Sequence, residues 1–125
     1  MVEDIAGGPG WGEDTELPAA ETVIRLLANQ RRRFALSCLL EYENAMTLAD
    51  LADEVTIKEQ DCSIEAISAE EVKRTYMSLY HTHVPKLEEA GFARYDQEQD
   101  MVALGSNPET IELYVEHVNK VLSDP

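Results

Sequence analysis

The sequence predicts a mainly α-helical domain with one small β-hairpin, and three observations carry this prediction. Apolar residues recur at steps of three and four over much of residues 18–91, which is the spacing of amphipathic helices. Two short alternations of apolar and polar residues, at 92–96 and 101–104, are separated by four polar residues, as in a hairpin. Asn107 and Pro108 then open a last helical pattern, because they suit an N-cap and a first helical position.

Length and composition set the domain boundaries. The 125 residues suffice for one domain of ordinary size. Residues 1–17 are rich in Gly, Asp and Glu, so we expect a flexible acidic tail there. Trp11 is the one large apolar group of that tail and either docks onto the domain or a partner, or stays free. We place the domain at 18–105 and a C-terminal dimerisation helix at 106–125.

Two helices are expected at the start of the domain. The first covers residues 18–28, with Val23, Leu26 and Leu27 facing inward and Ile24 at the margin of that face. Asn29 suits the N-cap of the second helix, over residues 30–43. The apolar face of this second helix consists of Phe34, Leu36, Cys38, Leu39, Leu40 and Tyr42. Cys38 is therefore expected to be a small core residue.

The next segment has the pattern of the first helix of a helix-turn-helix. Met46 lies in a short link that has room for one pair of strand residues, and Thr47 then caps a helix over residues 48–59. The phrase TLADLADEV has the helix-turn-helix shape, and its buried stripe is expected to be Leu48, Leu51, Ala52 and Val55. The link at 60–67 is longer than the usual three or four residues, which indicates an insertion.

The longest predicted helix covers residues 68–91, and both of its ends are marked. Ser68 and Glu71 form a capping box, and Gly91 is placed to end the last turn. Its apolar face consists of Val72, Tyr76, Leu79, Tyr80, Val84, Leu87 and Ala90. Pro85 lies inside the pattern, so a bend or break is expected two or three residues earlier.

The other face of this long helix carries hydrogen-bond donors in an otherwise acidic chain. These residues are Lys73, Arg74, Ser78, His81, Thr82 and Lys86. A helix that buries one side and offers such donors on the other suits the major groove of DNA. The alternative is an ordinary amphipathic helix whose polar face is simply exposed to water. With a helix before it and a hairpin after it, the long helix predicts a winged helix-turn-helix.

Arginines outside the long helix are further candidates for DNA contacts. Arg31, Arg32 and Arg33 stand at a helix start, where cations oppose the helix dipole. They either reach phosphates beside a groove or pair with acidic neighbours. Arg94, on the first strand of the hairpin, either enters the minor groove or forms a salt bridge with Asp96 or Glu98.

The last helix predicts self-association. Its apolar residues are Ile111, Leu113, Tyr114, Val115, Val118, Val121 and Leu122. Such an apolar surface beyond a complete domain favours packing against a second copy, with residues 19–28 supplying the facing surface. A two-fold dimer would present its two long helices about one DNA turn apart.

The net charge is unusual for a protein that binds DNA. The formal net charge is −15, and residues 22–95 contribute only −3, from twelve acidic and nine basic residues. An acidic balance normally argues against nucleic acid, but it also matches a protein of a high-salt cytoplasm. At molar salt, cations taken up between carboxylates and phosphates would replace the usual counterion release. We therefore expect a shallow or reversed salt dependence of DNA affinity.

The chain resembles a family of haloarchaeal winged-helix proteins in the runs LLANQRRRFALSCLLEYE, TLADLADEV and RTYMSLYHTHVPKLEEAGFARYD. The family is related in fold to the ArsR, MarR and PadR repressors. The resemblance covers about residues 20–105, and SLYHTHVPKLEEAGF is its most specific part. It implies a homodimeric, sequence-specific transcription regulator, and as a whole the chain resembles an oxidative-stress regulator of this family. By position, it implies recognition by Arg74, Ser78, His81, Thr82 and Lys86, with Arg94 on the wing.

Other functions find little support in the sequence. No Gly-rich phosphate loop, nucleophile elbow or carboxylate pair stands out, so we expect neither an enzyme nor a cofactor. His81 and His83 are two apart on a helix and point in different directions, so we expect no metal site. No apolar run of membrane length and no signal peptide is present, which favours the cytoplasm. The competing hypothesis is a winged-helix module for protein–protein assembly. If the signal is oxidative, Cys62 is a better sensor candidate than Cys38.

Overall fold

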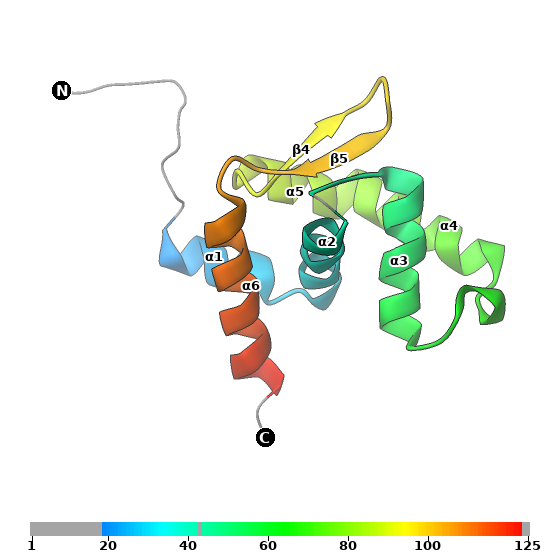
Figure 1. The fold of residues 1–125 in the computed structure, drawn as a ribbon, viewed down its shortest axis with the longest axis horizontal. Coiled ribbons are helices and arrows are strands. Elements are labelled where there is room, and N and C mark those ends of the chain that lie inside the picture. Colours follow the sequence, from blue (N-terminus) through cyan, green and yellow to red (C-terminus); the bar gives the residue numbers. More distant parts are fainter. Residues whose placement is uncertain (1–18, 43, 124–125) are drawn as a thin grey trace.

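The computed structural model describes residues 19–42 and 44–123 and shows a mainly helical fold with a small antiparallel sheet (Figure 1). The predicted tail at 1–17, with Trp11, lies outside the described residues. The α-helices are α1 (Ala20–Leu27), α2 (Gln30–Glu41), α3 (Leu48–Gln60), α4 (Ala69–Ser78), α5 (Val84–Glu89) and α6 (Pro108–Ser123). All the expected helices are therefore present, and the long one is divided.

The sheet contains three strands, one more than the predicted hairpin. Strands β4 (Ala93–Asp96) and β5 (Met101–Leu104) form that hairpin, and β3 (Ala45–Thr47) pairs antiparallel with the other side of β5. The strand order is β3-β5-β4. The link around Met46, in which one strand pair was expected, is thus a full edge strand. It ties the start of α3 to the hairpin, since the Leu48 N–H donates to the Asp100 carbonyl at 2.8 Å.

The caps of α2 and α3 follow the sequence prediction. Asn29 accepts a hydrogen bond from the Arg32 N–H, and Thr47 accepts one from the Asp50 N–H, so each polar cap satisfies a free amide of the first turn. Helix α2 ends two residues before the expected boundary. Asn44 then adopts a left-handed conformation with φ of 76°, and its N–H donates to the Leu39 carbonyl at 2.7 Å.

The core lies between α2, α3, the long helix and the inner face of the sheet. The predicted stripe of α3 and Cys38 of α2 are fully buried, which confirms these expectations. The largest fully buried side chains are Phe92, Leu27, Leu36, Leu39, Leu48, Leu51, Leu79 and Leu87. Two expectations were wrong. Ile24 of α1 is 62% exposed and Tyr42 at the end of α2 is 47% exposed, because each lies at the edge of its helix face.

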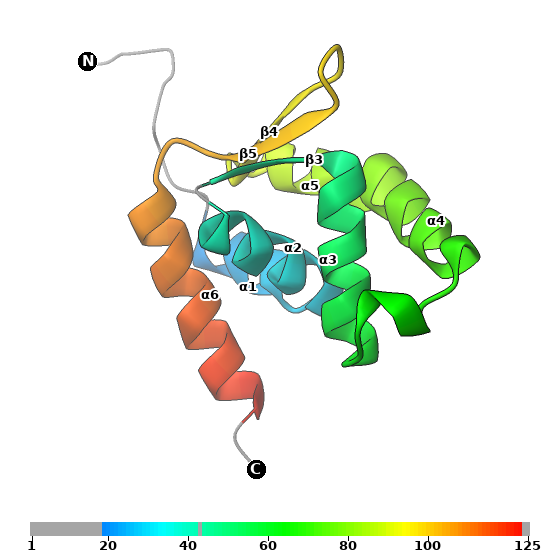
Figure 2. The same cartoon turned by 45° about the vertical axis from the view of Figure 1, so that its right-hand side comes forward.

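Helices α1 and α6 flank α2 on the side away from α3 (Figures 1 and 2). Helix α6 packs against both α1 and α2, and it buries Ile111 and Val115. Other apolar side chains of α6 stay outside this contact, since Leu113, Val121 and Leu122 are each more than half exposed.

The predicted bend in the long helix takes the form of a π-helical turn. Helices α4 and α5 are joined without a break by η2 (Leu79–His83), in which the Val84 N–H donates to the Leu79 carbonyl five residues earlier. Pro85 explains the position of this turn. Its ring nitrogen has no hydrogen to donate, and its ring would meet the carbonyl four residues before it in a regular helix. The wider turn removes that conflict while the chain stays helical.

Candidate nucleic-acid interface

The π turn keeps the donor residues of the long helix on one side. A π turn holds one residue more than an α turn, so the part that follows is rotated back by about 100°. Lys73 and Arg74 before the turn, and Thr82 and Lys86 within and after it, are all exposed, as is His81. Leu79, Val84 and Leu87 of the opposite side are buried. Ser78, the sixth predicted residue of this face, is half-buried.

The acidic residues near this face leave its cations largely free. The guanidinium of Arg74 lies 3.8 Å from the Glu70 carboxylate, and the two side chains are 70% and 77% exposed. An exposed pair at that distance contributes little, about 0.5 kcal/mol or less. The Glu71 carboxylate is already engaged in the capping box with Ser68. Arg74 can therefore exchange its carboxylate partner for a phosphate or a base at small cost.

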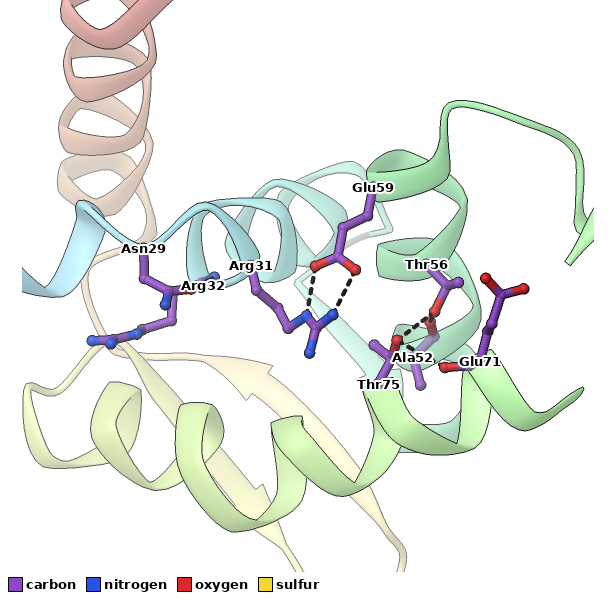
Figure 3. A network of polar contacts seen from close by, with 8 residues as sticks. All are labelled: Asn29, Arg31, Arg32, Ala52, Thr56, Glu59, Glu71 and Thr75. Atoms are coloured by element: carbon purple, nitrogen blue, oxygen red, sulfur yellow. Dashed lines mark hydrogen bonds and ion pairs between the residues drawn. The ribbon is translucent and has the colours of Figure 1, made fainter. Parts of the chain in front are cut away.

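Arg31 does not project toward a ligand but joins α2 to α3 (Figure 3). Its Nε and Nη2 donate to the two carboxylate oxygens of Glu59 at 2.5 and 2.7 Å. The hydrogen bonds that Arg31 donates to Glu59 raise the pKa of Arg31, and this effect is larger than the lowering by burial. Of the two alternatives for Arg31, the structure shows the pairing with an acidic neighbour.

Arg33 is used inside the fold. Its side chain is only 9% exposed. Nη1 donates to the carbonyls of Leu27 and Ala28 at 2.7 and 3.1 Å, and Nε donates to the Asn119 side chain at 2.9 Å. Arg33 thus satisfies the carbonyls at the C-terminal end of α1, where a cation is favourable, and connects them to α6. It is not available to phosphates in this conformation.

Arg32 is half-buried between α2 and the long helix. Burial lowers its pKa. Its Nε is enclosed and has no hydrogen-bond partner among the described residues. His83, in the π turn, is 8% exposed, and its Nδ1 likewise has no partner. Burial, followed by the positive charges of Arg32 and Arg31, lowers the pKa of His83 to about 4. His83 is therefore neutral at neutral pH.

A buried pair of threonines sets the contact between α3 and α4 (Figure 3). The hydroxyls of Thr56 and Thr75 lie 2.9 Å apart. Thr56 also reaches the Ala52 carbonyl at 2.7 Å, and Thr75 reaches the Glu71 carbonyl at 3.1 Å. The two hydroxyl protons are thus shared among three contacts, one back to each helix and one between the helices, which ties α3 to α4. The sequence pattern gave no sign of this pair.

Arg94 lies on a different face from the donors of the helix. It is exposed on β4 opposite Ala103, and it lines a shallow cavity of about 370 Å³ together with Asn44, Ala45 and Pro108. Tyr95, the next residue, points to the long helix instead. Arg94 pairs with neither of the acidic residues proposed for it, Asp96 and Glu98, which both belong to the described residues. Arg94 forms no ion pair with any residue of 19–42 or 44–123, and it lies on the outer face of the sheet.

A groove of about 350 Å³ lies between the long helix and the hairpin, and the sequence did not predict it. Tyr76 and Tyr80 of the helix, Tyr95 of β4 and Asp100 are among the residues that line it. Tyr76 and Tyr95 both donate hydrogen bonds to the Asp100 carboxylate. Two tyrosines four apart on a helix and a third on the following strand were the available signal. Their spacing alone predicts only that Tyr76 and Tyr80 belong to the apolar face of the long helix.

The two cysteines differ in environment. Cys38 is fully buried and Cys62 is partly exposed in the link between α3 and α4, and neither is in a disulfide. Burial raises the pKa of Cys38 to about 12. Because the thiolate is the reactive form, Cys38 is protected from oxidants by both burial and protonation.

The described residues contain neither a cluster of metal ligands nor a helix that could span a membrane. Within residues 19–42 and 44–123, no three His, Cys, Asp or Glu side chains gather where they would hold a metal ion. None of the helices in the described part is both long and apolar enough to cross a membrane.

Comparison with known proteins gives one match. No curated protein and no solved structure matches the chain. Residues 24–103 match the model of a protein family described as a domain of unknown function, DUF7344. The matched segment begins in α1 and ends in β5, so it contains the long helix, the groove and most of the hairpin. Because this segment is more than half of the 125 residues, the chain belongs to the DUF7344 family.

Proposed function

We propose that the protein is a sequence-specific DNA-binding transcription regulator that acts as a homodimer. The single observation that carries the proposal is the outer face of the long helix. Lys73, Arg74, His81, Thr82 and Lys86 are exposed together on one continuous helical surface, and the opposite side of that helix is anchored in the core. Such a surface suits insertion into the major groove, with Arg and Lys to guanine or phosphate and Thr to a thymine methyl.

The surrounding elements support a winged helix-turn-helix arrangement. Helix α3 packs against α4, and the β4–β5 hairpin follows α5 after a short turn in which Gly91 has a φ of 81°. In this proposal α3 and the long helix form the helix-turn-helix, and the hairpin is the wing that lies near the minor groove. The link between the two helices contains a short 3₁₀ turn at Ile64–Ala66.

The set of contact residues is smaller than the sequence suggested. Arg31 and Arg33 are left out because their guanidinium groups are bound inside the fold. Arg32 has limited exposure, and Arg94 would require DNA to follow the outer face of the sheet. Ser78 is half-buried and is placed for a minor contact at most. The proposed recognition residues are Lys73, Arg74, His81, Thr82 and Lys86.

The exposed apolar residues of α1 and α6 support self-association. Ile24 is 62% exposed, and Leu113, Val121 and Leu122 are 65%, 57% and 54% exposed. Because α1 and α6 pack together, these side chains supply one apolar surface for a second copy. We expect the protein to sediment as a dimer and a Leu113→Glu/Val121→Glu variant to sediment as a folded monomer. A parent protein that sediments as a monomer at micromolar concentration would contradict this part of the proposal.

The decisive experiment compares two variants of equal charge change. DNA sites are selected from random duplexes with the full chain, and affinity is then measured for an Arg74→Ala/His81→Ala/Lys86→Ala variant. We expect at least a hundredfold loss, since a base or phosphate contact is worth about 1–3 kcal/mol. The control is Arg25→Ala/Lys58→Ala, which removes two cations away from the helix face and should bind like the parent. Equal binding by both variants would overturn the proposal.

Salt dependence gives a second test. With a net charge of −15, the dimer needs cations between its carboxylates and the phosphates. We expect the affinity to change little, or to rise, from about 0.5 M to several molar KCl, instead of the steep fall caused by counterion release. A conventional steep fall over that range would contradict the cation-mediated interface.

A protein–protein assembly module is the second candidate. The observation that favours it is the internal use of Arg31 and Arg33, which leaves fewer free cations in an acidic molecule. The selection of DNA sites from random duplexes distinguishes DNA binding from protein–protein assembly. If no duplex is enriched from the random pool by the parent protein, the outer face of the long helix is better assigned to a protein partner.

A further inference from the structure

The groove between the long helix and the hairpin has a chemical character that DNA contacts do not explain. It is lined by three tyrosines, Tyr76, Tyr80 and Tyr95, together with Met77, His81, Gln97 and Asp100. Neither lysine nor arginine lines it. A surface for phosphates would need cations, and this one presents aromatic rings and a carboxylate.

The three tyrosine rings pack against one another beside the groove. The rings of Tyr76 and Tyr80 are nearly parallel, at 12°, with centroids 6.5 Å apart. The ring of Tyr95 is nearly perpendicular to that of Tyr80, at 78°, with centroids 6.0 Å apart. A cation in the groove therefore meets a cluster of aromatic rings, and cation–π attraction acts within about 6 Å of a ring centroid.

Asp100 adds a carboxylate to this groove. Its carboxylate accepts hydrogen bonds from the hydroxyls of Tyr76 and Tyr95, and its backbone is held in a left-handed conformation, with φ of 55°. Within residues 19–42 and 44–123, no lysine or arginine forms an ion pair with Asp100. Burial and the neighbouring Asp100 raise the pKa of both tyrosines, so their hydroxyls stay protonated and continue to donate to the carboxylate.

We propose that this groove binds a small organic cation that carries a methylated ammonium group. The faces of aromatic rings attract such a cation, and its methyl groups replace water against the apolar walls. The volume of about 350 Å³ lies in the range of small-ligand sites. A bare metal cation is a poorer fit, because the groove offers one carboxylate and no set of oxygen ligands. The inference does not rest on DNA binding, and its test contains no DNA.

The test uses choline and its uncharged carbon isostere, 3,3-dimethyl-1-butanol, which differ in charge but hardly in shape. Each is titrated into the isotopically labelled full chain at about 1 M KCl, which screens non-specific attraction to the acidic surface. Chemical shifts of the tyrosine rings report binding. We expect choline to shift Tyr76, Tyr80 and Tyr95 and to bind about tenfold more tightly than the isostere. Equal affinity for both would show a merely apolar groove and overturn the proposal.

Three variants locate the site and separate charge from shape. Tyr80→Leu should weaken choline binding about tenfold, and Asp100→Asn should weaken it with little change in the isostere. Tyr42→Leu removes an exposed tyrosine outside the groove and should bind choline like the parent. Because Tyr80→Leu removes a ring that also contacts Tyr95 of the hairpin, denaturant unfolding and the amide chemical shifts of β5 are measured for each variant to verify that the hairpin stays folded. Unchanged choline affinity in both Tyr80→Leu and Asp100→Asn would refute the site.

Discussion

The arginines at the start of α2 and the cations of the long helix have similar side chains and opposite surroundings. Arg31 and Arg33 donate to Glu59, to two backbone carbonyls and to Asn119. Arg74 has one loose, exposed contact with Glu70, and Lys73 and Lys86 are exposed. The arginines of α2 connect helices, whereas the cations of the long helix are exposed to ligands.

The difference shows that a basic run in a sequence is not in itself an interface. The run RRR was the densest cluster of positive charge in the chain, yet two of its members are committed to internal bonds. The dispersed cations of the long helix share a face because the helical period and the π turn bring them together. Partners and exposure, rather than charge density along the chain, separate the two groups.

The largest effect is expected at Arg33. Arg33→Met should lower the free energy of unfolding by about 3 kcal/mol, because it leaves the carbonyls of Leu27 and Ala28 buried without a donor. Denaturant unfolding followed by circular dichroism measures this change. Under conditions where the variant is folded, its DNA affinity should equal that of the parent. A large loss of affinity with unchanged stability would reverse the assignment of Arg33 to the interior.

The next effect is expected in the pH dependence of stability. The pKa of His83 is lowered from 6.5 to about 4 in the folded protein, so the unfolded chain binds more protons between these values. The free energy of unfolding should therefore fall as pH decreases from about 6.5 to 4, by on the order of 2 kcal/mol from this group. Facing groups are Arg31, Arg32, Lys86 and Glu59.

His83→Gln isolates this contribution, since the acidic residues of the chain also titrate in that range. The stability of the parent relative to the variant should rise, by on the order of 2 kcal/mol, as pH rises from 4 to 6.5 if the His83 proton is responsible. A constant difference across the range would mean that His83 has the same pKa in the folded and unfolded chain.

A smaller effect is expected for the ion pair between Arg31 and Glu59. Arg31→Met and Glu59→Gln should each destabilise the protein, and the double variant should show a coupling of about 1 kcal/mol. The pair is bidentate and its side chains are 30% and 17% exposed, so solvent screens it in part. A coupling near zero in a double-mutant cycle would place Arg31 among the free cations.

The smallest change in stability is expected on the outer face of the long helix. Arg74→Ala and Lys86→Ala should each alter the free energy of unfolding by less than about 0.5 kcal/mol, because neither side chain packs into the core. The same variants should each lower DNA affinity by about tenfold. A strong destabilisation by either would show that the long helix uses these cations to hold the fold, as α2 uses Arg33.

The sequence predicted the elements well and the partners of individual side chains poorly. Helical periodicity, the capping box at Ser68 and the alternation in the hairpin are local, and the structure contains each of them. The partners of Arg31 lie 28 residues away and one partner of Arg33 lies 86 away. No local pattern encodes such pairs, since they depend on how the helices cross.

The groove was missed for the same reason. Tyr80 and Tyr95 are on different elements, and their ring contact depends on the angle of the hairpin. The predicted bend before Pro85 is present as the π-helical turn at Leu79–His83. The form of that bend, a wider turn that realigns the exposed face, needed the backbone geometry.

The close contact between Gly91 and Gly105 restricts the movement of the hairpin. A Cβ atom on Gly105 would lie 2.0 Å from the Gly91 carbonyl oxygen, so no side chain fits there without displacing the backbone. The Gly105 N–H also donates to the Phe92 carbonyl at 2.9 Å. The two stems of the hairpin are thus held together at the root. At the other end, the Leu48 N–H donates to the Asp100 carbonyl, so the hairpin is fixed at both ends and cannot shift without disturbing the start of α3.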